Sequence, residues 1–213
     1  SEWRVTDRLT LHGGLRLEYL RHAYTNNMID GNTRDDGTEC GFGGCLYTRP
    51  ADRSDEFVDA APKLSLAFDV NEQLMLYANL ARGFRAPQAT ELYRLQSGQE
   101  VADLKSERID AFEIGARKIT GGLSLDVAYF AMSKRGSVYR DADGFNVTGA
   151  ASLHRGVEIT FDWQFADAWS VAFNATYARH TYDFDVVASR GETFVSGRDV
   201  DTAPRWLGSL ELK

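Results

Sequence analysis

The 213-residue sequence has no stretch of about 18 consecutive apolar residues, and this absence excludes a transmembrane helix. Proline is scarce, with four residues, whereas glycine is common, with 19. This mixture is typical of strands joined by tight turns. The net charge of −7 argues against a nucleic-acid partner. Neither a low-complexity tract nor a break in composition marks a second domain, so the length fits one domain.

Amphipathic segments follow one another along the whole chain. In the clearest one, residues 157–165, apolar and polar side chains alternate at every position as VEITFDWQF. A period of two kept over this length predicts a strand with one apolar and one polar face. A soluble antiparallel sheet with one solvated face alternates in the same way, so alternation alone leaves the class of sheet open. Similar runs occur near residues 9–19, 64–68, 74–80, 112–117, 123–129, 171–177 and 206–212.

The links between these segments alternate in length. Short links lie near residues 5–8, 70–72, 119–122 and 166–168, and long polar links near 24–56, 84–106, 135–153 and 183–202. A soluble sandwich has no reason to place every long connection at the same end of its strands. Outer-membrane barrels have short periplasmic turns and long outer loops. We therefore predict an all-β, antiparallel transmembrane β-barrel in the bacterial outer membrane, with long loops extracellular and short turns periplasmic.

Aromatic residues gather where strands meet the short links. Phe68, Trp163 and Phe165 precede such links and Trp169 follows one. Barrels carry aromatic girdles at the membrane boundary, although ordinary core aromatics are an alternative. Because a Lys or Arg facing lipid at mid-bilayer costs about 2–4 kcal/mol, we expect the charged faces to line a water-filled lumen.

The strand count limits this interpretation. We count about eight or nine strands, and the last residues stop within a strand pattern. Bacterial single-chain barrels close with an even number of strands, and lipid does not tolerate an open sheet edge. We therefore expect the chain to be part of a larger barrel.

Residues 77–94 read YANLARGFRAPQATELYR, and they carry a recognisable motif. Three further segments follow it in order: LKSERIDAFEIG at 104–115, RGVEI at 155–159 and APRWLG at 203–208. Together they resemble the TonB-dependent outer-membrane receptors, and the resemblance covers nearly the whole chain. The motif residues are Arg82, Gly83, Phe84, Arg85, Ala86, Pro87 and Glu91.

The resemblance implies that residues 1–213 are a partial barrel domain, the C-terminal half of a barrel of roughly 22 strands, without the plug domain and the last strands. It also implies a receptor that contacts outer-membrane lipid and imports a scarce nutrient. Ferric siderophores are the commonest cargo of the family, and haem and cobalamin are others. The TonB complex would act only through the absent N-terminal plug. The alternatives are a passive porin-like barrel and a secreted β-sandwich adhesin, both of which bind without active transport.

We expect cargo to bind at the rim and loops through aromatic and cationic side chains. An alternative is that the motif shapes its strand and loop, and that the other residues serve loop packing or the girdle. Pro87 supports this alternative, because proline cannot donate to a strand ladder and so predicts a strand end. The candidate binding residues are Arg82, Arg85, Tyr93, Arg94, Tyr139, Arg140 and Tyr182.

The two cysteines, Cys40 and Cys45, flank a glycine-rich spacer in the first long link. In an oxidising compartment this pattern favours a local disulfide. A zinc site is the rival, but the pair supplies only two of the four ligands that zinc usually takes.

The remaining polar residues predict no metal site, no cofactor and no enzyme. The acidic stretches 30–37 and 141–144 lack the ligand spacing of an EF-hand-type calcium loop and are interpreted as solvated turns. No pair among the histidines shows the spacing of a metal or catalytic site. We also find no nucleophile elbow, phosphate-binding glycine loop or carboxylate pair. The four histidines are His12, His22, His154 and His180.

Overall fold

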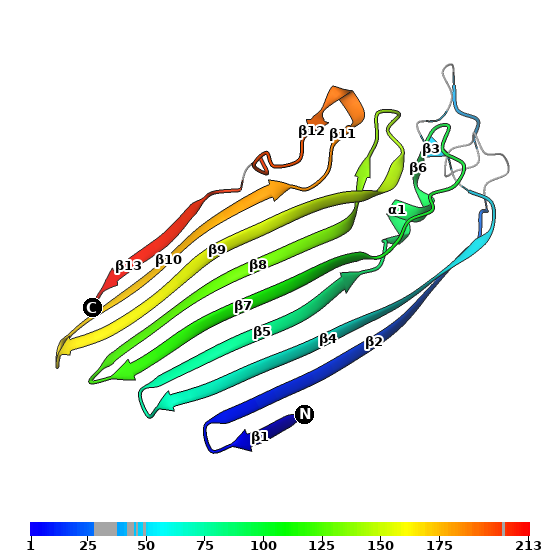
Figure 1. Cartoon of the computed structure of the whole chain (residues 1–213). Helices are drawn as coiled ribbons and strands as arrows, with labels where there is room; N and C mark the ends of the chain where they lie inside the picture. Colours follow the sequence, from blue (N-terminus) through cyan, green and yellow to red (C-terminus); the bar gives the residue numbers. More distant parts are fainter. Residues whose placement is uncertain (28–37, 42–44, 46, 49, 202) are drawn as a thin grey trace.

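The computed structural model describes residues 1–27, 38–41, 45, 47–48, 50–201 and 203–213. Its main feature is a nine-stranded antiparallel sheet in which each strand lies beside its neighbour in the sequence (Figure 1). This sheet confirms the predicted all-β, antiparallel wall. Its strands are β1 (Glu2–Thr6), β2 (Leu9–Tyr24), β4 (Arg53–Asn71), β5 (Leu74–Arg85), β7 (Glu107–Thr120), β8 (Leu123–Arg140), β9 (Asn146–Ala166), β10 (Trp169–Tyr182) and β13 (Trp206–Leu212).

The smaller elements lie at the end of the sheet that carries the long links, which we call the loop end (Figure 1). There, β3 (Tyr47–Thr48) pairs with β6 (Leu95–Gln96), and β11 (Val186–Val187) pairs with β12 (Thr193–Phe194). A short helix, α1 (Ala89–Tyr93), precedes β6, and a 3₁₀ turn, Ser189–Gly191, lies between β11 and β12. Within the described residues no helix is both long enough and apolar enough to cross a membrane.

The opposite end of the sheet, the turn end, is closed by two-residue turns. Between β7 and β8 the turn residues Gly121 and Gly122 have φ angles of 51° and 80°, which only glycine adopts readily and which suit a tight hairpin. Between β4 and β5 the Asn71 carboxamide oxygen accepts hydrogen bonds from the backbone N–H groups of Gln73 and Leu74, at 2.9 and 3.0 Å. Local chemistry therefore fixes these turns within a residue or two of their predicted places.

The third long link is shorter than predicted. The sequence pattern placed a loop at 135–153, but β8 and β9 continue to Arg140 and Asn146 and leave only residues 141–145 between them. The register shifts between Arg135 and Val138, where Gly136 has a φ angle of 75°. This bulge breaks the alternation of side chains, so the upper hairpin did not look like paired strands in the sequence.

The strand register separates two faces. Leu125, Phe161, Phe173 and Leu210 stand opposite one another on β8, β9, β10 and β13. The next row on the same strands is polar and faces the other way: Asp126, Thr160, Asn174 and Ser209. We call the apolar side the outward face and the polar side the lumen face.

Aromatic side chains mark two levels of the outward face. Trp163 and Trp169 lie at the turn end and are 43% and 53% exposed. A second row joins Tyr129, Val157, Tyr177 and Trp206 across four strands, and the rings of Tyr177 and Trp206 lie 4.7 Å apart. On β9 this row is eight positions from Phe165, or about 26 Å along the strand, which is close to the roughly 25 Å apolar band of membrane barrels.

The two faces should respond differently to the same charge. We predict that Phe161→Arg, on the outward face between the two aromatic levels, lowers the free energy of unfolding by about 2–4 kcal/mol. Thr160→Arg, the neighbouring position on the lumen face, should change it by much less because water solvates the new charge. Urea unfolding of the full-length protein in lipid vesicles measures both, and equal losses would contradict this assignment of faces.

Candidate functional site

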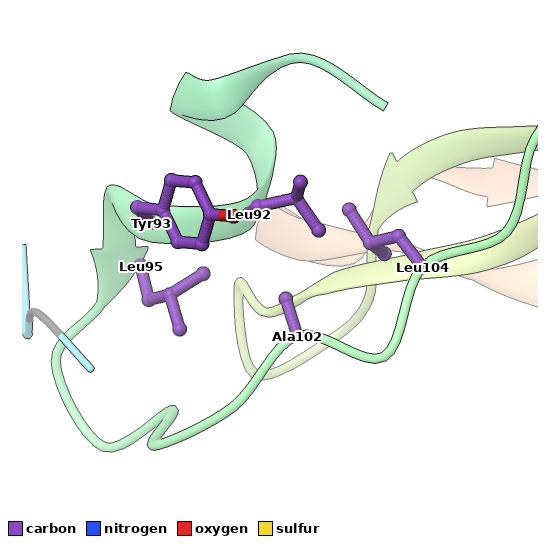
Figure 2. Packing of buried hydrophobic residues seen from close by; sticks show 5 residues of the cluster. All are labelled: Leu92, Tyr93, Leu95, Ala102 and Leu104. Carbon is purple, nitrogen blue, oxygen red and sulfur yellow. The ribbon is translucent and has the colours of Figure 1, made fainter. Parts of the chain in front are cut away.

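The segment between β5 and β7, residues 86–106, folds into a small apolar cluster at the loop end. The side chains of helix α1 and of the strand and loop that follow it converge there (Figure 2). Tyr24, Phe57 and Val138 pack against the cluster from β2, β4 and β8. Because Tyr24 and Phe57 belong to the lumen face, residues 86–106 cover that face, and we call them the cap. The cluster consists of Leu92, Tyr93, Leu95, Ala102 and Leu104.

The RGFRAP motif builds the start of the cap. The Arg85 guanidinium lies 3.0 Å from the Glu91 carboxylate and 3.7 Å from that of Glu107 on β7. Glu91 also accepts a 2.7 Å hydrogen bond from the backbone N–H of Gln88, which closes a capping box at the first turn of α1. Arg85, Gln88 and Glu91 thus turn the chain out of β5 and into the helix.

Tyr93 fastens the cap to β4. Its hydroxyl donates a 2.9 Å hydrogen bond to the Asp55 carboxylate, and its ring stacks on Tyr24 with centroids 4.5 Å apart. Burial, together with the nearby Asp55 carboxylate, raises the pKa of Tyr93 to about 12, so its phenol stays protonated as a donor at physiological pH. Arg53 pairs in turn with Asp55.

Amide side chains fasten the other side of the cap to the tip of the β8–β9 hairpin. Gln99 and the backbone of Asn146 exchange two hydrogen bonds, at 2.9 and 3.0 Å. The Asn146 side chain also donates to the Glu91 carbonyl at 2.9 Å. At the end of the cap, the Ser106 hydroxyl donates to the buried Asp59 carboxylate on β4. The cap is therefore bonded to strands on both of its sides.

Arg82 takes a different place from Arg85, although both belong to the same motif. It lies on the outward face, and its Nε is 2.6 Å from the Asp110 carboxylate on β7. There it lines a cleft of about 550 Å³ together with Arg108 and Arg135. The structure thus does not bring Arg82 together with the candidates on the lumen side.

Four aromatic rings form a second cluster, beside the β8–β10 strand ends, which we call the rim cluster. Phe184 and Phe194 stack with centroids 5.4 Å apart, and Tyr182 meets Phe194 edge-on at 4.9 Å. Tyr139 lies 5.7 Å from Phe184. Tyr139, Tyr182, Phe184 and Phe194 are all partly exposed, so the cluster offers ring surfaces at the loop end.

Cationic side chains also lie at the loop end. Arg140 is exposed at the end of β8, beside Tyr139. Arg179 and Arg205 both donate to Asp199, with Nε–oxygen distances of 3.2 and 3.1 Å. Arg205 and Arg179 hold the pKa of Asp199 below its usual range, so this carboxylate stays ionised between them.

The candidate binding residues thus fall into three places. Arg85 and Tyr93 are held within the cap, with Arg94 exposed beside them. Arg82 lies on the outward face. The third group, at the strand ends of β8 and β10, consists of two partly exposed rings and an exposed cation: Tyr139, Arg140 and Tyr182.

Cys40 and Cys45 are joined by a disulfide, with their Cα atoms 5.1 Å apart. The carboxylate of Asp141 accepts backbone hydrogen bonds from Asp143 and Phe145, so it shapes the hairpin tip. The acidic stretch 30–37 lies outside the described residues. Among the residues described, no group of three or more His, Cys, Asp or Glu side chains is arranged to hold a metal ion.

Sequence reasoning missed two arrangements. It treated residues 86–106 as a loop, whereas they form the cap around α1; a capping box at Gln88 and Glu91 was the available signal. It also found no histidine pair with the spacing of a metal or catalytic site, and it did not consider pairing across neighbouring strands. His154 and His180 are paired across β9 and β10, with their Nδ1 atoms 2.8 Å apart.

Together, the two-faced meander, the aromatic levels and the single loop end define a segment of an outer-membrane-type β-barrel wall. The sequence profile of the family described as "TonB dependent receptor-like, beta-barrel" matches residues 1–213. The chain therefore belongs to the TonB-dependent receptors, a family of outer-membrane β-barrels.

Relatives and solved structures agree with this assignment. The pesticin receptor of Yersinia enterocolitica is 22% identical over 188 residues, which cover 86% of this chain and 25% of the relative. The ferric yersiniabactin uptake receptor FyuA from Yersinia pestis has a TM-score of 0.70 at 19% identity, covering 99% of this chain and 29% of that one. The ferric-catecholate import receptor Fiu from E. coli K12 has a TM-score of 0.71 at 21% identity, covering 99% and 30%. The chain thus spans between a quarter and a third of their length.

A double-mutant cycle tests the structural role of Arg85. We predict that Arg85→Ala and Glu91→Ala each loosen the cap and that their effects on unfolding free energy are not additive, with a coupling of about 1 kcal/mol. Arg82→Ala is the matched control, because Arg82 lies three residues away on the opposite face and should add independently to Glu91→Ala. Chemical unfolding of the full-length receptor in detergent gives these energies. Additivity of Arg85→Ala with Glu91→Ala would contradict the role proposed for the ion pair.

The cysteine pair gives a chemical prediction. Unfolded protein treated with a maleimide reagent in the absence of reductant should leave Cys40 and Cys45 unmodified, because a disulfide has no free thiol. Prior reduction should make both reactive, as counted by mass spectrometry. Full labelling without reductant would overturn the disulfide.

Proposed function

We propose that this chain is part of the wall and rim of a receptor that takes up a ferric siderophore across the outer membrane with energy relayed by TonB. The observation that carries the proposal is the rim cluster at the loop end, with the exposed Arg140 next to Tyr139 in the sequence. Ferric siderophores are bulky and commonly anionic, and they present flat or apolar edges. Exposed rings and guanidinium groups are the side chains that match such a surface.

The similar proteins support this class of cargo. Two of the similar solved structures are a ferric yersiniabactin uptake receptor and a ferric-catecholate import receptor. At about one-fifth identity they establish the fold, and the loops that contact cargo are free to differ. The proposal therefore names ferric siderophores as a class, ahead of haem and cobalamin.

The orientation of the wall follows from the same proposal. The loop end, with the cap and the rim cluster, would face the cell exterior, and the two-residue turns would face the periplasm, as in outer-membrane barrels. Coupling to TonB would act through a plug domain outside this chain. Membership of the family favours this receptor over the passive porin-like barrel and the β-sandwich adhesin.

A ligand panel tests the proposal. We expect the full-length receptor in detergent to bind at least one of the ferric catecholate, phenolate and hydroxamate siderophores, measured by quenching of its intrinsic fluorescence. The double variant Tyr182→Ala with Phe184→Ala should bind that siderophore about tenfold more weakly, since the loss of well-placed aromatic contacts costs about 1–2 kcal/mol.

Phe165→Ala is the matched control, because it removes an aromatic ring from the turn end of the outward face. It should leave siderophore affinity unchanged. Binding of haem or cobalamin without any ferric siderophore would contradict the proposed cargo, and equal losses in both variants would contradict the role of the rim cluster.

A further inference from the structure

Two imidazole rings meet on the lumen face of the wall, at a place that the proposed siderophore function does not use. His154 on β9 and His180 on β10 stand opposite each other in the register. Their Nδ1 atoms are 2.8 Å apart, and both side chains are partly exposed, so an ion in the lumen can reach them. One ring nitrogen of each histidine therefore lies beside that of the other.

Ser152 orients the first of these rings. It lies two residues before His154 on the same face of β9, and its hydroxyl oxygen is 2.9 Å from His154 Nε2. When this hydroxyl accepts the Nε2 proton, Nδ1 carries the free lone pair and faces His180. Histidines that bind metals are commonly held in this way, with the other ring nitrogen donating to an oxygen.

The separation of the two nitrogens is short enough for both to bind one metal ion. With metal–nitrogen distances of about 2.0–2.1 Å, two ligands at a right angle lie about 2.9 Å apart, and two at the tetrahedral angle lie about 3.3–3.4 Å apart. The observed 2.8 Å is close to the right-angle value.

The neighbouring strand, β8, carries a thioether in register with His154, and its nearest cation is neutralised by an ion pair. Met132 on β8 stands directly opposite His154 in the register, on the same face, at the usual separation of cross-strand partners. Its thioether is a soft ligand that copper accepts. Lys134, the nearest cation on that strand, is held by Glu107 with an Nζ–oxygen distance of 3.2 Å. This ion pair offsets a charge that would otherwise repel a metal ion.

We propose that His154 and His180 form a transition-metal site on the lumen wall, with Cu²⁺ as the preferred divalent ion, Met132 as a third donor and Ser152 as the residue that positions His154. In the neutral pair His180 carries its proton on Nδ1; on metal binding this proton moves through solvent to His180 Nε2, so both rings stay neutral and both Nδ1 atoms are free to bind the ion. The preference for Cu²⁺ follows from the order of affinities of nitrogen ligands for the first-row divalent ions.

Copper titration of the full-length receptor tests the site. Chelator-treated receptor in detergent is titrated with copper sulfate and followed by calorimetry and by electron paramagnetic resonance. We expect the wild type to bind one more equivalent of Cu²⁺ than the double variant His154→Ala with His180→Ala, with nitrogen hyperfine splitting that the double variant lacks. Ser152→Ala should weaken binding about tenfold, as expected for loss of an orienting hydrogen bond.

Two controls make the outcome decisive. His12→Ala removes a different lumen-face histidine, on β2, and should leave both the stoichiometry and the spectrum unchanged. The pair His154→Gln with His180→Gln repeats the test with side chains that still form hydrogen bonds, and heat-modifiable migration in gels shows that each barrel is folded. Equal copper binding by the wild type and a folded double variant would overturn the proposal. So would a spectrum that changes with His12→Ala and not with the double variant.

Discussion

Peptide groups inside a lipid bilayer have no water to bond with, so a chain that crosses it must pair every N–H and C=O within the protein. In this receptor wall the pairing is a ladder of eight consecutive antiparallel contacts from β1 to β13, each between strands that follow one another among the long strands of the sheet. Once the ladder is set, the alternation of side chains decides what each face meets. The apolar outward face, the polar lumen face and the two aromatic levels all follow from it.

At the loop end, the irregular backbone of the cap obtains hydrogen-bond partners in another way. There side chains supply the missing partners: Gln99 bonds the backbone of Asn146, and Asn146 bonds the carbonyl of Glu91. The motif arginine Arg85 neutralises the carboxylate of Glu91 that caps α1. The rim cluster beside β8 and β10 is not part of this framework, and its rings stay partly exposed.

Much of the wall could be predicted from the sequence because strand faces and tight turns are set by residues close together in the chain. The upper β8–β9 hairpin was missed because the bulge near Gly136 interrupts the local pattern. The histidine pair was missed for a related reason. A register shift between Trp169 and Ser170 places His154 opposite His180, and an unshifted register would place it opposite Thr181. A shift of one residue at a turn is not visible in the alternation of the strands above it.

The cap differs from the wall in the kind of contact that holds it, because its bonds to β4 and β9 run through side chains. Wall strands pair with the next long strand. The bond from Tyr93 to Asp55 spans 38 residues, and that from Gln99 to Asn146 spans 47. The cap is therefore joined through side chains to strands that come before and after it in the sequence, so a change to one of these side chains can alter the cap while the ladder of the wall stays paired.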